Sequence, residues 1–117
     1  MSQVAQEVAS NATFTATAPL ALLATYQAFF NFGQSSTSTR TATVPLQNVP
    51  VGAKTAIIAN QAFNLYYTNN EQYGYGALQV SLSTSLSQAS CTVTLRDNNT
   101  NKRVWEGTVT GIVSFFG

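Results

Sequence analysis

The sequence predicts an all-β fold, a single-domain antiparallel β-sandwich or jelly roll of about seven to eight strands. Apolar and polar residues alternate with a period of two in most segments, as half-buried strands require. These segments are rich in Thr, which strands favour, and turn residues separate them. A chain of 117 residues is long enough to bury one core in a single domain. We assign residues 1–10 to an N-terminal arm and residues 11–117 to the β-sandwich domain.

The first predicted strands lie in "NATFTATA" (residues 11–18), in the apolar segment 20–32 and in "STRTATVPL" (residues 38–46). Every even position of the segment 20–32 is apolar. A helix is the competing interpretation, because Pro19 suits a first helical turn. That helix would place Gln27 and Asn31 on its apolar stripe, so we predict a strand. At this length the strand needs a bend or a change of sheet.

The clearest alternation is in "ALQVSLSTSL", residues 77–86. One face of this predicted strand is apolar, broken only by Thr84, and carries Leu78, Val80, Leu82 and Leu86. The other face is polar and carries Gln79, Ser81, Ser83 and Ser85. We expect the polar face to meet solvent or another subunit.

The last segments predict a hairpin in which "CTVTLRD" (residues 91–97) pairs with the strand that contains Trp105. Pairing Leu95 with Trp105 turns both apolar sets toward one core and places Asp97 opposite Arg103. The loop is then residues 98–102. "GIVSFFG" (residues 111–117) is the last predicted strand. Cys91 is interpreted as a small buried apolar residue.

Four of the five tyrosines lie between residues 60 and 79, among amides and two glycines. Alternation places Phe63, Leu65 and Tyr67 on one face, and "TNNEQ" supplies turn residues. We therefore predict a second hairpin here, stabilised by aromatic cross-strand pairs. The alternative is a lectin-like carbohydrate-binding surface, because Tyr and Asn side chains also stack on sugars and bind protein partners. Its candidate residues are Tyr66, Asn69, Asn70, Tyr73 and Tyr75.

Charge is scarce, at 8% of residues against about 25% in typical domains. Ser, Thr, Asn and Gln make up 46 of the 117 residues, so solubility rests on hydroxyls and amides. A net charge of +1 gives little repulsion between copies, which permits self-association. The chain has five basic residues, and three of them lie close in sequence to the acidic residues Asp97 and Glu106. They do not make a phosphate-binding patch. Nucleic acid is therefore not expected as a partner.

The sequence contains few residues that could act in catalysis. The chain has no His, the commonest general base and metal ligand. Of its four carboxylates, Asp97 lies opposite Arg103 and Glu106 lies diagonal to Arg96 in the predicted hairpin. "DNNTN" (residues 97–101) lacks the later glycine and acid of a calcium loop. We therefore predict a non-enzymatic protein without catalytic, cofactor-binding or metal-binding residues.

The N-terminus lacks the basic start and apolar segment of a signal peptide. The apolar stretch 19–32 is too short to span a bilayer and contains two amides. We expect no membrane insertion.

Self-assembly is the function that these features favour. The arm has few apolar residues with which to anchor itself, whereas open strand edges of a neighbouring subunit would hold it. Candidate assembly contacts are Val4, Val8, Phe115 and Phe116. The expected protein is a virus or phage particle component (coat, cement or decoration protein) or a fibre subunit, located in a virion or an extracellular assembly. Its expected partners are copies of itself and other structural proteins, with glycans as the partners in the lectin-like alternative.

Overall fold

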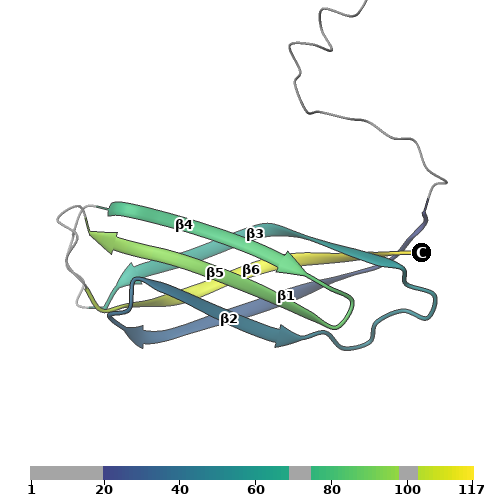
Figure 1. Cartoon of the computed structure of the whole chain (residues 1–117), viewed down its shortest axis with the longest axis horizontal. Coiled ribbons are helices and arrows are strands. Elements are labelled where there is room, and N and C mark those ends of the chain that lie inside the picture. Colours follow the sequence, from purple (N-terminus) through teal and green to yellow (C-terminus); the bar gives the residue numbers. More distant parts are fainter. Residues whose placement is uncertain (1–19, 69–74, 98–102) are drawn as a thin grey trace, which may run out of the picture.

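A computed structural model describes residues 20–68, 75–97 and 103–117, which form an all-β fold of two antiparallel three-stranded sheets (Figure 1). The described residues contain no helix, and hence none long and apolar enough to cross a membrane. The strands are β1 (Leu22–Ser35), β2 (Thr39–Pro45), β3 (Thr55–Tyr67), β4 (Tyr75–Thr84), β5 (Gln88–Asp97) and β6 (Trp105–Phe116).

The described residues form six strands rather than the expected seven to eight. One difference is that "GIVSFFG" is not separate, because β6 continues from Trp105 to Phe116 without a break. The segment 11–18 lies outside the described residues. The apolar segment 20–32 is a strand, as predicted. It does not change sheet, and its register with β6 shifts between Leu22 and Ala24 and between Phe32 and Ser35.

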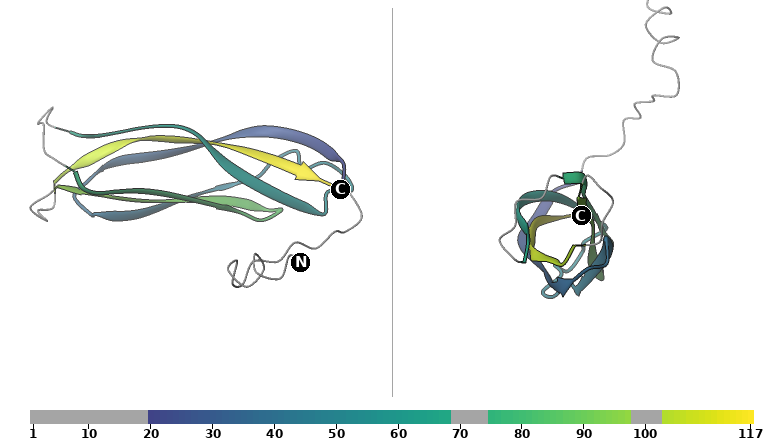
Figure 2. Two further views of the ribbon diagram at one scale, coloured as in Figure 1. Left: turned by 90° about the horizontal axis from the view of Figure 1, so that it is seen from above. Right: turned by 90° about the vertical axis from the view of Figure 1, so that its left-hand side faces the viewer.

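The first sheet has the order β1-β6-β3 and the second sheet has the order β2-β5-β4. Figure 2 shows the two sheets as two layers that face each other. Across the interior, β1 lies next to β2 and β3 lies next to β4. The central strands β6 and β5 each have a neighbouring strand on both sides within their own sheet. Among consecutive described strands only β4 and β5 pair with each other. The other connections pass from one sheet to the other.

Both predicted hairpins are therefore wrong. The strands β5 and β6 belong to different sheets, as do β3 and β4. Leu95 and Trp105 are nevertheless both buried, because they point into the same core from opposite sheets. Alternation requires only that the two apolar sets share a core, and two facing sheets satisfy this as well as a hairpin does.

Period-2 alternation correctly predicts which residues of the central strands are buried in the core. Every second residue of β5 is buried from Ala89 to Asp97, and so is every second residue of β6 from Val109 to Phe115. Leu78, Val80 and Leu82 are partly buried against this core, while Leu86 lies exposed beyond the end of β4. The buried apolar residues come from both sheets and are Ala28, Phe30, Phe32, Leu65, Tyr67, Ala89, Cys91, Val93, Leu95, Trp105, Val109, Val113 and Phe115.

One charged side chain, Arg40 of β2, joins the two sheets. It pairs with Val93 in the register and therefore faces inward. Its guanidinium carbon lies 3.7 Å from the centroid of the Trp105 ring, and it donates hydrogen bonds to the carbonyl oxygens of Gly33 and Trp105. The Trp105 Nε1 donates in turn to the Thr37 carbonyl oxygen at 2.9 Å. Burial lowers the pKa of Arg40, which still stays charged at neutral pH because the ordinary pKa of arginine is so high.

We expect Arg40→Lys to lower the free energy of unfolding by about 1–2 kcal/mol. An ammonium group cannot stack flat on Trp105 and reach both carbonyl oxygens at once. Urea denaturation followed by tryptophan fluorescence measures the change, and Arg96→Lys is the matched control. Equal stability of the two variants would show that the stacked guanidinium adds nothing to the join between the sheets.

Candidate binding surfaces

The outer face of the first sheet carries large apolar side chains. In the register Leu22 pairs with Phe116, Phe29 pairs with Thr110 and Ile57 pairs with Ser114. Ile112 lies diagonally between Phe29 and Ile57 on the central strand, where neighbouring side chains come within contact distance. Leu22, Phe29 and Ile57 are 59%, 58% and 57% exposed. We name the set of Leu22, Phe29, Ile57, Ile112 and Phe116, which share this outer face, the apolar band.

Two pairs of polar side chains beside the apolar band hydrogen-bond to each other. Gln27 Nε2 donates a hydrogen bond to Gln61 Oε1 at 2.9 Å, from the two edge strands of the sheet. The hydroxyls of Thr25 and Ser114 lie 3.4 Å apart. Hydrogen-bonded pairs of this kind lose less when water is removed than unpaired groups do.

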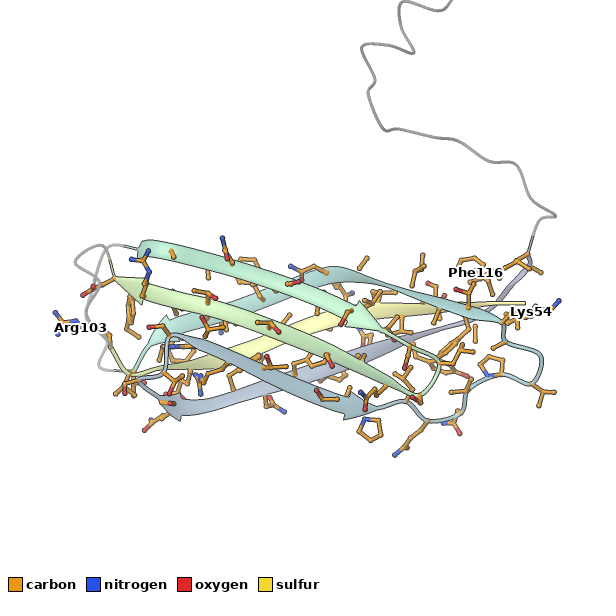
Figure 3. The ribbon with its side chains drawn as sticks, viewed as in Figure 1. Lys54, Arg103 and Phe116 are labelled. Carbon is orange, nitrogen blue, oxygen red and sulfur yellow. The ribbon has the colours of Figure 1, made fainter. Side chains whose placement is uncertain are left out.

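The charges near this face lie at its two ends, within the part of the chain that is described. Glu106 lies on the outer side of β6 at one end and accepts a hydrogen bond from Gln34 Nε2 at 3.1 Å. Lys54 precedes β3 at the other end, close to Phe116 (Figure 3). The predicted diagonal pair between Glu106 and Arg96 does not occur, because these residues belong to different sheets. The middle of the face therefore carries no charge among the described residues, although the Gln27–Gln61 hydrogen bond crosses it.

The outer face of the second sheet has the opposite character. Hydroxyl groups pair across β2 and β5, with oxygens 2.9–3.0 Å apart in Thr39–Thr94, Thr41–Thr92 and Thr43–Ser90. On β4 the outward residues Gln79, Ser81 and Ser83 are exposed, as alternation predicts. We name this surface the hydroxyl face. Its rows of hydroxyls and amides favour solvent.

A cavity of about 330 Å³ opens between β1 and β2. Tyr26, Val44, Leu46, Val113 and Phe115 form its apolar side, and Gln27, Gln47 and Asn48 supply amides. The Tyr26 ring meets Phe115 edge-on, with centroids 6.0 Å apart. The lining includes no carboxylate, amine or thiol. The cavity can accept an apolar group, but its lining holds no acid, amine or thiol for acid–base or metal chemistry.

One of the candidate sugar-binding residues, Tyr66, is 43% exposed on the outer side of β3, and Asn64 is exposed on the same side. Tyr75 begins β4, but its side chain lies outside the described residues, as do Asn69, Asn70 and Tyr73. Leu65 and Tyr67 are buried as predicted. Phe63 faces the same side but is 49% exposed, because β3 is an edge strand.

The candidate assembly contacts at the C-terminal end separate into two environments. Phe115 is 1% exposed and packs into the core, so it does not lie where a second chain could reach it. Phe116 points outward and belongs to the apolar band. Backbone hydrogen bonds in both directions between Ala21 and Gly117 hold this end of the chain. Val4 and Val8 lie outside the described residues.

The predicted contact between Asp97 and Arg103 is confirmed, although the predicted strand pairing is not. Arg103 Nε donates to Asp97 Oδ2 at 3.0 Å, and the Asp97 side chain is 1% exposed. This pair spans the connection between β5 and β6, from one sheet to the other. Its burial and pairing indicate a structural role. The described residues include no group of three or more potential metal ligands.

The apolar band was missed at the level of sequence, although a signal for it exists. Each of its members stands beside a second apolar residue, as in Phe29-Phe30, Ile57-Ile58 and Phe115-Phe116. In a strand, two consecutive apolar residues must point to opposite faces. One member of each doublet is then left on the outer face.

Comparison with known proteins finds no matching family model, no similar protein among those with curated functions and no similar solved structure.

Cys91 is fully buried on β5, as predicted, and burial raises the pKa of its thiol from 9.0 to about 11. The folded chain therefore keeps a proton that the unfolded chain has lost in this pH range. We expect the free energy of unfolding to fall as pH rises from about 9 to about 11. Urea denaturation of the protein and of Cys91→Ala across this range isolates the effect. A stability difference between the two that does not change with pH would contradict it.

Proposed function

We propose that this protein is a non-enzymatic structural subunit that assembles with copies of itself. The observation that carries the proposal is the apolar band on the outer face of the first sheet, where Leu22, Phe29 and Ile57 are each more than half exposed. Contiguous apolar patches of this kind on soluble proteins mark interaction sites. We assign the assembly to a virus or phage particle component (coat, cement or decoration protein), with a fibre subunit as the related form.

The arrangement of the two sheets supports this assignment. Each sheet has two edge strands, and the facing sheets favour a β-sandwich over a jelly roll, whose eight strands exceed the six described. Open edges accept a strand from another chain, and a chain of low net charge does not repel its copies. The proposed partners are therefore copies of this chain and other structural proteins, in a virion or an extracellular assembly.

The first test replaces two residues of the apolar band, in the variant Phe29→Lys with Ile57→Lys. Burying each original side chain contributes about 1.5–3 kcal/mol, so losing both should weaken assembly about 100-fold or more. Light scattering over a dilution series measures the change. The matched control is Ser81→Lys with Ser83→Lys, which places the same charges on the hydroxyl face. An oligomer that resists the first variant as well as the control would refute a role for the band.

The second test removes residues 1–10, the proposed arm. Fixing each backbone residue costs about 1–2 kcal/mol, and this segment offers few apolar side chains to offset that cost. We expect the truncated protein to keep its β-sheet circular dichroism spectrum and to form a weaker oligomer. Sedimentation velocity at several concentrations gives the measurement. An oligomer of unchanged size and unchanged stability to dilution would show that the arm is not a connector.

A lectin-like carbohydrate-binding module that uses segment 60–79 is the second candidate. The exposed Tyr66 ring beside Asn64 favours it, because sugars stack on aromatic faces. A chain that stays monomeric and binds a glycan array, with binding lost in Tyr66→Ala, would replace assembly as the function.

A further inference from the structure

The apolar band needs a partner surface that is itself apolar and uncharged. The outward positions of the second sheet are hydroxyls and amides, arranged in the paired rows of the hydroxyl face. An apolar surface laid on them would gain little, because these rows offer few apolar groups to bury against it. Within the described residues, the surface that matches the apolar band is the same band on a second copy.

We infer that two copies of this chain pair face to face through the outer surfaces of their first sheets, related by a two-fold axis. This inference rests on the proposed function and names the partner of its central surface. In such an interface the same patch serves both subunits. Sheets packed in this way lie about 10 Å apart with their strands about 30° from parallel.

Two polar pairs near the apolar band are compatible with burial. The Gln27–Gln61 hydrogen bond and the Thr25–Ser114 pair satisfy groups that would otherwise face the second copy without partners. Glu106 and Lys54 lie at opposite ends of the face, so neither carries its charge into the middle. Removing water from the centre of the face therefore leaves no isolated charge buried there.

The area of the face is sufficient for a specific dimer. Three strands about 4.8 Å apart and 12 residues long, the length of β6, form a face of roughly 600 Å². Two copies then bury about 1,200 Å², above the roughly 1,000 Å² that a specific interface requires. The edge strands stay open in this dimer, so dimers can join further through their edges.

A cross-linking experiment on the full chain tests the pairing with matched cysteines. Ser114→Cys places a thiol on the outer face of the first sheet, on the central strand β6 and two residues before Phe116. Ser90→Cys places one on the hydroxyl face, on the central strand β5. Both serines lie beside a threonine hydroxyl, Thr25 at 3.4 Å and Thr43 at 3.0 Å. The native Cys91 is fully buried and gives little background, which the wild-type protein measures.

Each variant is treated with a bis-maleimide that spans about 10 Å, the spacing of packed sheets. A third sample mixes the two variants, with a tag on one to separate the products by size. We expect Ser114→Cys to cross-link to itself as a dimer, at concentrations where light scattering shows assembly. We expect Ser90→Cys to remain at the wild-type background, alone and in the mixture. Thr110→Cys, four residues earlier and near the midpoint of β6, is cross-linked in the same way. It replaces Ser114→Cys if circular dichroism shows that this variant is not folded.

The outcomes separate this inference from the proposed function. An assembled protein in which neither Ser114→Cys nor Thr110→Cys cross-links to itself overturns the face-to-face pair and leaves self-assembly standing. Joining of Ser114→Cys to Ser90→Cys in the mixture also overturns it, because the subunits then stack head to tail. A chain that is monomeric at every concentration overturns both.

Discussion

The stack of Arg40 on Trp105 is the interaction on which the arrangement of the two sheets depends. Arg40 comes from the second sheet and Trp105 from the central strand of the first. The guanidinium also binds the Trp105 carbonyl oxygen, and the indole binds the Thr37 carbonyl oxygen, so side chain and backbone are held together. Apolar side chains alone pack without direction, whereas these contacts set the position of one sheet over the other. The Asp97–Arg103 pair adds a second directional contact where the chain crosses between the sheets.

The inner faces pack against each other except at the cavity between β1 and β2. The groups that other molecules can reach therefore lie in that cavity, on the outer faces and at the sheet edges. The two outer faces differ, since one carries the apolar band and the other carries paired hydroxyls. Because of this difference, the molecule should take one orientation in an assembly. The apolar band favours an apolar partner surface, whereas the hydroxyl face favours water. A chain with few charges can bring such faces together without large desolvation costs.

Residue environments were easier to predict than strand partners. The inward positions of β5 and the exposed serines of β4 follow from alternation alone. Leu95 and Trp105 were correctly assigned to one core and wrongly assigned to one hairpin. Asp97 and Arg103 do meet, because the connection between their strands is short enough to bring them together in either arrangement. Phe63 shows the limit of alternation, because an inward position on an edge strand is only partly covered.

The sequence by itself determined that this chain is a β protein, which residues face its core and how little charge its surface carries. These properties follow from local periodicity and composition, which every strand expresses without reference to its neighbours. Only the tertiary structure decided which strands pair, because hairpins and facing sheets bury the same alternating side chains. It also decided that Leu22, Phe29, Ile57, Ile112 and Phe116 share one outer face. They come from three strands far apart in the chain, and pairing on both sides of β6 brings them together.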